Sequence, residues 1–174
     1  MTDIELEPVD LTNKGLIDNL WQYYELESSF WSKEDVDAAG RFASLEGFLA
    51  RVGQPDSFDS GFIIKYQSQI AGFLIVGDEF LFGKPIREFS DIYVLPKYRG
   101  LGITSEVIRL TILKSDRPWM VCVFRNDHNA HAFWRKAFAR LPFSAVYENN
   151  PPEVGHFHEY IVNDPTGIHC HHER

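Results

Sequence analysis

Residues 91–113 read DIYVLPKYRGLGITSEVIRLTIL, an apolar strand that runs into a glycine-bearing turn and then into a helix with an apolar stripe. Gly100 and Gly102 lack a Cβ, so the main chain of the turn can approach a ligand closely and adopt positive φ. The first N–H groups of a helix have no internal partner and lie at the positive end of the helix dipole. The stretch therefore predicts a site for a phosphate or pyrophosphate that is built from backbone.

This turn differs from two common phosphate-binding loops. Gly102 is followed by Ile103, Thr104 and Ser105, so the third glycine of a dinucleotide fingerprint is absent, as is the Gly-Lys-Ser/Thr ending of a P-loop. Two alternatives stay open on these residues alone. One is a glycine-containing connection without a ligand, and the other is a nucleotide-phosphate binder that shares only the turn.

Length and composition predict one compact domain over residues 1–174. The chain is 44% hydrophobic and 14% aromatic, which argues against disorder. Its net charge of −8 disfavours nucleic acid as a partner, because phosphates demand a basic face, and favours a small cationic substrate. We therefore expect a small-molecule partner and no nucleic acid.

The sequence predicts a cytoplasmic protein that does not bind to a membrane. No apolar run is long enough to span a bilayer, and the start, MTDIELEPVD, is acidic where a signal peptide is basic. The two cysteines, Cys122 and Cys170, offer neither a disulfide framework nor a zinc spacing, and we expect reduced thiols with Cys122 buried.

Hydrophobic periodicity predicts a strand, two helical regions, a hairpin, a strand, the turn with its helix, a strand, a helix and two closing strands. A loop is expected over residues 28–41, and a turn at Asn-Asn-Pro-Pro before the last strand. The predicted elements cover residues 4–9, 11–26, 42–52, 62–66, 70–76, 89–94, the helix after Gly102, 119–124, 130–141, 143–148 and 156–162.

The segment Lys97–Gly102, directly after a strand, resembles the Gln/Arg-x-x-Gly-x-Gly/Ala motif of the GNAT superfamily of acetyl-CoA-dependent N-acetyltransferases. Lys97 departs from the motif, since it keeps the charge of arginine but loses the planar fork. The predicted element order is also that of the GNAT fold. The resemblance implies an α+β (α/β) fold with a mixed, mostly antiparallel sheet of about six to seven strands, flanked by helices and splayed between strands 4 and 5. It covers a core of about residues 4–163, and residues 164–174 read as a mobile tail.

A second segment, residues 125–134, is similar to the part of that family in which an Asn precedes an Ala-containing helix. Ala130, Ala132, Phe133 and Trp134 also resemble a subgroup of predicted acetyltransferases. The resemblance implies acetyl-CoA as co-substrate, held by a strand that bonds the pantetheine arm and by the turn that holds the pyrophosphate. The cofactor-binding residues it implies are Ile92, Tyr93, Val94, Arg99, Gly100, Leu101, Gly102, Ile103, Thr104, Ser105 and Asn126.

Two carboxylates are candidates for the base that deprotonates the acceptor amine. Glu88 lies six residues before Val94 and matches the base position of the histone-type branch, whereas Asp91 matches an acidic position of the polyamine-type branch. The adjacent base of that second branch is replaced here by Ser90. Alternation along a strand puts residues 88, 90, 92 and 94 on one face and Asp91 on the other, unless a bulge intervenes.

The sequence offers several candidates for the general acid. The resemblance puts Trp134 where many family members have a tyrosine, and indole cannot protonate a thiolate, so the simplest interpretation of Trp134 is core packing. Tyr147, Tyr160, His128 or water are the alternatives. The thiolate can also leave unassisted, because a thiol pKa near about 8.5 makes that tolerable.

For the acceptor pocket the resemblance implies the first helix and the segment after it. The acceptor candidates are Trp21, Tyr24, Glu25 and Trp31, beside Tyr23, Glu27 and Phe30. Aromatic rings with carboxylates suit a cationic amine. His156 and His158 point the same way on a strand but lack a convincing third ligand, so we expect no metal.

Together these features predict an N-acetyltransferase that acts on a primary amine of a small cationic molecule by direct transfer in a ternary complex, since no cysteine is placed as an acyl relay. The alternative is a noncatalytic acyl-CoA-binding or regulatory module on the same fold. Family members are often dimers, so a homodimer is compatible with the resemblance. The acceptor, the acyl-chain length and the oligomeric state do not follow from the residues.

Overall fold

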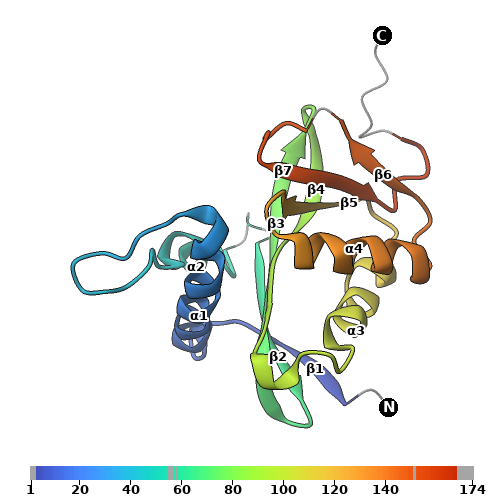
Figure 1. Ribbon diagram of the computed structural model, residues 1–174. Helices are drawn as coiled ribbons and strands as arrows, with labels where there is room; N and C mark the ends of the chain where they lie inside the picture. The colour runs from blue at the N-terminus through green and yellow to red at the C-terminus, as the bar shows by residue number, and fades with distance from the viewer. Residues whose placement is uncertain (1–2, 55–56, 58, 151, 168–174) are drawn as a thin grey trace. The chain divides into compact units, whose positions relative to one another are not determined.

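The computed structural model describes residues 3–54, 57, 59–150 and 152–167 of the chain (Figure 1). Its elements follow the predicted order. The helices are α1 (Lys14–Ser32), α2 (Glu46–Arg51), α3 (Ile103–Leu110) and α4 (His128–Arg140), with 3-10 turns η1 (Pro96–Tyr98) and η2 (Ile112–Lys114). The strands are β1 (Ile4–Pro8), β2 (Ser60–Tyr66), β3 (Gln69–Leu81), β4 (Lys84–Val94), β5 (Trp119–Phe124), β6 (Val146–Asn149) and β7 (Phe157–Val162).

The seven strands form one mixed sheet in the order β1-β2-β3-β4-β5-β7-β6. The pairs β1-β2, β2-β3, β5-β7 and β6-β7 are antiparallel. The pair β4-β5 is parallel and joins Arg87 to Trp119 and Glu88 to Met120. This arrangement confirms the predicted α+β fold, and the short parallel register agrees with the predicted splay between the fourth and fifth strands.

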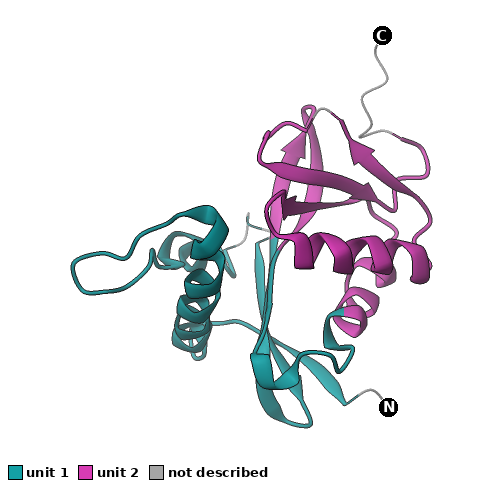
Figure 2. Ribbon diagram, in the orientation of Figure 1, with its two compact units in different colours: residues 1–76, 91–104 teal, residues 77–90, 105–174 magenta. Residues whose placement is uncertain are grey.

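The chain divides into two compact units, and β3 and β4 contribute to both (Figure 2). Unit 1 comprises residues 1–76 and 91–104 and includes β1, β2, α1 and α2. Ile17 and Leu20 of α1 pack there against Ile63 and Phe73 of the hairpin. The same core receives Tyr93 from the end of β4, so the last residues of that strand are fixed by the packing of unit 1.

Unit 2 comprises residues 77–90 and 105–174 and includes β5, α4, β6 and β7. The helix α4 lies beside β5 (Figure 1), and Trp134 on this helix packs edge-on against Phe89 of β4 at 5.5 Å between ring centroids. Leu81, Ile86 and Ile161 form a second buried cluster in this unit. The predicted single domain of residues 1–174 stays a prediction.

The expected bounds of the first two helices were wrong. The helix α1 continues to Ser32, into the first part of the predicted loop, and the hydroxyls of Ser28 and Ser29 donate there to the carbonyls of Glu25 and Leu26. It ends at Lys33, whose φ of 65° is left-handed. Conversely, α2 is shorter than predicted.

The segment before α2 is held by side chains of α1 rather than by helical bonds. Gln22 accepts a hydrogen bond from the backbone N–H of Phe42, and Asp18 accepts one from the N–H of Leu45. Tertiary contacts therefore override the helical spacing of the apolar residues in this segment.

A second hairpin was missed by the periodicity. The predicted hairpin is confirmed, with Gln67 and Ser68 at positive φ, but β3 continues to Leu81 and β4 begins at Lys84. The connection is Phe82-Gly83, with φ of 51° and 75°, which suits a tight turn between twisted strands. The polar run Gly77-Asp78-Glu79 hid this extension, since it interrupts the apolar pattern.

No helix among the described residues is long and apolar enough to cross a membrane. Cys122 is partly exposed, contrary to the expectation of burial. Pro151 of the expected Asn-Asn-Pro-Pro turn, Cys170 and most of the expected mobile tail lie outside the described residues.

Candidate active site

The glycine-bearing turn has the backbone conformation that its sequence predicts. Gly100 and Gly102 adopt φ of +80° and +78°, which side-chain-bearing residues rarely adopt. No described heavy atom lies within 4 Å of a Cβ built at either residue, beyond their chain neighbours. The helix α3 begins at Ile103, directly after the turn. The turn is thus open, and it leads into the N–H groups that begin a helix.

The end of β4 lies closely against β3. A Cβ on Gly72 would lie 1.9 Å from the carbonyl oxygen of Tyr93, so only glycine permits this approach. The N–H of Leu95 donates to the carbonyl of Ala71 over 2.8 Å. These contacts fix the backbone of the predicted pantetheine-binding residues, of which Tyr93 is buried and Ile92 and Val94 are half-buried.

The structure joins Asp91 to a predicted acceptor residue. The hydroxyl of Tyr24 on α1 donates a hydrogen bond of 2.7 Å to Oδ1 of Asp91. Burial of the carboxyl raises the pKa of Asp91, and the hydrogen bond from Tyr24 opposes that rise. Asp91 therefore lies in unit 1, against the helix that carries the acceptor candidates.

A second carboxylate lies near this pair. Burial raises the pKa of Glu25, the hydrogen bond from Ser28 lowers it, and the charge of Asp91 raises it further. The ring of Tyr24 lies 4.9 Å from that of Trp21 and 6.1 Å from that of Tyr93. The predicted acceptor residues Trp21, Tyr24 and Glu25 thus cluster with Asp91.

The remaining members of the expected acceptor wall behave differently. Phe30 is 77% exposed and packs edge-on against Trp31 at 6.3 Å between ring centroids. Glu27 binds Arg99: Nη2 of Arg99 donates to both of its carboxylate oxygens, at 2.8 and 2.9 Å. The carboxylate of Glu27 is therefore occupied by Arg99, at the start of the glycine-bearing turn, rather than free to bind a substrate amine.

The other candidate base, Glu88, lies in unit 2. Its Oε2 accepts a hydrogen bond of 3.0 Å from the hydroxyl of Ser90, so these two side chains share one face of the strand, as alternation predicts. Burial raises the pKa of the Cys122 thiol, and the charge of Glu88 adds to the rise. This thiol is therefore protonated at neutral pH and is a poor nucleophile.

Trp134 is a core residue, as the simplest interpretation of the sequence proposed. It is buried at 5% exposure between the rings of Phe89, Phe133 and Phe138. Asn126 is exposed in the turn before α4, and Asp127 caps this helix by accepting a hydrogen bond from the N–H of Ala130.

The sequence reasoning missed His131, which lies one turn before Trp134. Its Nε2 is 2.9 Å from the hydroxyl of Tyr160, so one of the expected acid candidates is paired with an imidazole. The sequence could have indicated His131 through its spacing of three residues from Trp134, which puts both on one side of the predicted helix. The other candidates, Tyr147 and His128, are exposed.

The histidines of β7 and the turn before it are engaged with side chains. His158 stacks on His131 at 4.1 Å between ring centroids and lies 3.1 Å from a carboxylate oxygen of Glu148. His156 stacks on Phe124. In the described part of the chain, no group of three or more His, Cys, Asp or Glu is arranged to hold a metal ion.

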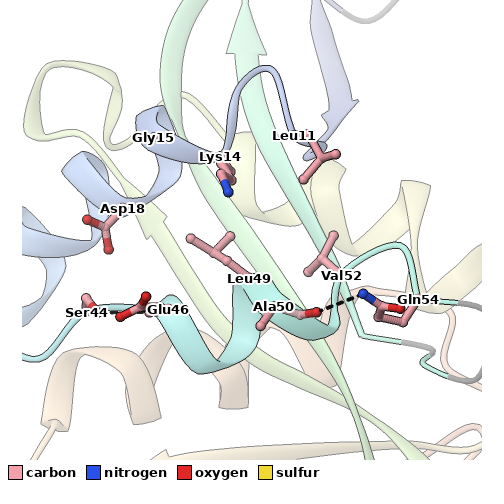
Figure 3. A pocket seen from close by; sticks show the side chains of 10 residues that line it. All are labelled: Leu11, Lys14, Gly15, Asp18, Ser44, Glu46, Leu49, Ala50, Val52 and Gln54. Atoms are coloured by element: carbon pink, nitrogen blue, oxygen red, sulfur yellow. Dashed lines mark hydrogen bonds between the residues drawn. The ribbon is translucent and has the colours of Figure 1, made fainter.

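A separate cavity of about 580 Å³ lies in unit 1 between the start of α1 and the α2 segment (Figure 3). None of the predicted site residues lines it. Its charged groups are already engaged in part, since Asp18 binds Arg41 over 3.1 Å. We therefore assign the site to the turn and to the Tyr24–Asp91 pair. The cavity is lined by Leu11, Lys14, Gly15, Asp18, Ser44, Glu46, Leu49, Ala50, Val52 and Gln54.

Comparison with known proteins agrees with this geometry. The family model described as the acetyltransferase (GNAT) family matches residues 16–139, which include most of α1, the turn and most of α4. No curated protein sequence matches the chain.

Several solved structures share the fold. An acetyltransferase from Thermus thermophilus is 14% identical, with a TM-score of 0.63 over 92% of this chain and 96% of that one. Naa50 from Arabidopsis thaliana, in complex with the bisubstrate analogue CoA-Ac-MVNAL, is 16% identical, with a TM-score of 0.54 over 92% and 97%. A variant of the spermidine N-acetyltransferase SpeG from Vibrio cholerae is 14% identical, with a TM-score of 0.52 over 92% and 91%. At such identities the likeness concerns the fold.

Proposed function

The chain belongs to the GNAT family of acetyltransferases, and we propose that it transfers the acetyl group of acetyl-CoA to a primary amine of a small cationic molecule. Transfer is direct, within a ternary complex. The net reaction converts an ammonium and acetyl-CoA into an N-acetyl amide, the coenzyme A thiol and one proton. The nitrogen–carbon bond forms as the carbon–sulfur bond of the thioester breaks.

The coenzyme lies along the end of β4 and the turn. The open conformation at Gly100 and Gly102 supports a pyrophosphate held by backbone N–H groups from Arg99 to Ser105. The strand residues Ile92, Tyr93 and Val94 bind the pantetheine arm through their backbone, in the manner of strand addition. Asn126, which precedes α4, is a further coenzyme contact that the family resemblance implies.

Asp91 is the base that we favour. Its carboxyl has a raised pKa and contacts Tyr24, next to Trp21 and Glu25. A carboxylate with a raised pKa takes a proton from an ammonium more readily than an ordinary one. Aromatic rings beside carboxylates also attract a cation. Glu88 is the second candidate for the base. Its carboxylate accepts a hydrogen bond from Ser90 within unit 2.

The departing thiolate takes its proton from water or from the Tyr160 hydroxyl. Trp134 supplies no acid, because an indole cannot protonate a thiolate, and its ring is buried among aromatic side chains. Within unit 2 the Tyr160 hydroxyl lies 2.9 Å from Nε2 of His131, with which it could exchange a proton. Burial raises the pKa of Tyr160, which keeps its hydroxyl protonated and able to donate.

The single observation that carries this proposal is the Tyr24–Asp91 hydrogen bond, because it joins the strand before the turn to the helix of the acceptor candidates. The experiment is a thiol-release assay with acetyl-CoA across polyamines, amino acids, aminoglycosides and peptides. We expect release with at least one polyamine or aminoglycoside, and a mass gain of one acetyl group on that amine. Absence of release across the whole panel would overturn the proposal.

A further inference from the structure

The side chain of Arg99 turns back from the glycine turn toward the strand that precedes it. Its Nε donates a hydrogen bond of 2.8 Å to the carbonyl of Val94, five residues earlier. The same side chain therefore closes the loop formed by residues 95–98, which carries η1. This contact fixes the point at which the chain enters the turn at Gly100.

The guanidinium of Arg99 is also tied to α1. Nη2 donates to both carboxylate oxygens of Glu27, at 2.8 and 2.9 Å, and the group lies over the ring of Tyr93, 5.4 Å from its centroid. Hydrogen bonds between charged groups are roughly twice as strong as neutral ones. The positive charge of Arg99 is therefore already paired with the Glu27 carboxylate in the absence of a bound phosphate.

Tyr93 completes the arrangement from the end of β4. Its hydroxyl donates a hydrogen bond of 2.9 Å to Oε1 of Glu27, while its ring packs in the core of unit 1. Burial, together with the bond to Glu27 and its charge, raises the pKa of Tyr93 to about 12, so the hydroxyl remains a donor. Glu27 thus receives donors from both the strand and the turn.

We propose that Glu27 and Arg99 are positioning residues that hold the coenzyme turn against α1, and that Arg99 serves the pyrophosphate through its backbone rather than its guanidinium. This inference rests on the proposed function. It also means that α1, which carries the acceptor candidates, and the glycine-bearing turn should move together as one rigid part of unit 1. A direct ionic contact between Arg99 and phosphate is the competing account, and the two accounts differ in what Glu27 does.

Calorimetric titration with coenzyme A separates the two accounts through Glu27→Gln, Arg99→Gln and the double variant. The pair is about half exposed, with side chains 46% and 40% accessible, so we expect a moderate effect. Each single change should raise Kd about three- to ten-fold, which corresponds to roughly 0.7–1.4 kcal/mol. The double variant should bind no more weakly than Arg99→Gln, because both changes break the Glu27–Arg99 contact and only the Arg99 change also removes the hydrogen bond to Val94.

Two further variants sharpen the test. Arg99→Lys keeps the charge but cannot span Val94 and Glu27 with a planar fork, so it should behave like Arg99→Gln. Arg51→Gln is the matched control, since it breaks an ion pair of 2.6 Å with Asp59 elsewhere in unit 1. This control should leave the affinity for coenzyme A unchanged.

In turnover assays the Glu27 and Arg99 variants should raise KM for acetyl-CoA with less than about a two-fold change in kcat.

Several results with the variants would contradict the inference while leaving the proposed function in place. They are tighter or unchanged binding in Glu27→Gln while Arg99→Gln binds weakly, retention of affinity by Arg99→Lys alone, and additive losses in the double variant. Absence of any heat with coenzyme A in the unmodified protein would instead overturn the proposed function, and with it this inference. Normal binding in the unmodified protein and in all variants would overturn only the positioning role.

Discussion

The hydroxyl of Tyr24 on α1 donates a hydrogen bond of 2.7 Å to the carboxyl of Asp91 on β4, across 67 positions of the sequence. The bond counteracts the effect of burial on this carboxyl, because a donor stabilises the ionised form. An acidic group that must accept a proton is thus kept ionisable beside the residues expected to bind the amine. In the proposed mechanism, the pair links binding of the acceptor to deprotonation of its amine.

Replacement of Tyr24 by Phe tests this link. Loss of the donor should raise the pKa of Asp91 further, so the acidic limb of kcat/KM should move to higher pH. The free energy of unfolding should fall by about 1 kcal/mol through loss of the hydrogen bond. Tyr66→Phe is the control, since Tyr66 is a partly buried tyrosine of unit 1 that packs on Tyr98. A limb that stays in place in Tyr24→Phe argues against Asp91 as the base.

Asp91→Asn should separate activity from stability. The loss of a general base should lower kcat by about 10²–10⁴-fold while the affinity for coenzyme A stays nearly intact. The folded state raises the pKa of Asp91, so its ionisation costs stability at a pH above that raised value. The uncharged variant should therefore resist urea better than the parent at neutral pH, and this advantage should vanish below the ordinary aspartate pKa of 3.8.

Glu88→Gln is the matched variant for the second carboxylate. We expect it to keep most of the turnover, because Glu88 is bonded to Ser90 and lies beside the Cys122 thiol, whereas Asp91 is bonded to an acceptor candidate, Tyr24. A large loss of kcat in Glu88→Gln with normal turnover in Asp91→Asn would reverse the assignment.

Gly72→Ala tests the close approach of β3 and β4. The added Cβ would lie 1.9 Å from the carbonyl oxygen of Tyr93, so the strand carrying Asp91 must move. We expect a loss of about 3 kcal/mol or more in urea unfolding, at the upper end of overpacking effects. Gly47→Ala in α2 is the control, because nothing lies within 4 Å and alanine favours a helix by up to about 1 kcal/mol. Equal stability of the two variants would contradict the predicted clash.

The histidine pair of unit 2 predicts a dependence of stability on pH. Burial, His158 and Arg135 lower the pKa of His131, so the unfolded chain binds more protons than the folded one just below the ordinary histidine pKa of 6.5. Stability should be fully present above that value and should fall as the pH decreases. His131→Gln should flatten the decline of the urea midpoint between about pH 7 and 5. Parallel curves for the parent and His131→Gln would refute the assignment.

Local patterns predicted much of the fold. Apolar runs bounded by turn residues predicted β2, β5 and β7, and the Gly100–Gly102 spacing predicted the positive φ at both glycines. The length of β3 could not be predicted in the same way, because Asp78 and Glu79 interrupt its apolar pattern. The extension of α1 to Ser32 was missed because Ser28 and Ser29 interrupt the apolar pattern, although their hydroxyls donate to helical carbonyls.

The sequence predicted which residues belong to the candidate site, but it did not predict which of them contact one another. Asp91 and Tyr24 were both candidates, but their contact depends on tertiary packing of unit 1. The sequence alone put Glu27 with the acceptor residues, and only the structure shows that Arg99 engages it. The pairing of His131 with Tyr160 likewise needs the fold, because α4 and β7 are brought together by packing within unit 2.

The central claim is that the turn holds acetyl-CoA for transfer to an amine beside Asp91. A crystal structure of the protein with bound coenzyme A tests it most directly. We predict that the pyrophosphate oxygens accept hydrogen bonds from backbone N–H groups of residues 99–105, and that the thiol end points toward Tyr24 and Asp91. Coenzyme A with its pyrophosphate bound away from this turn would contradict the account.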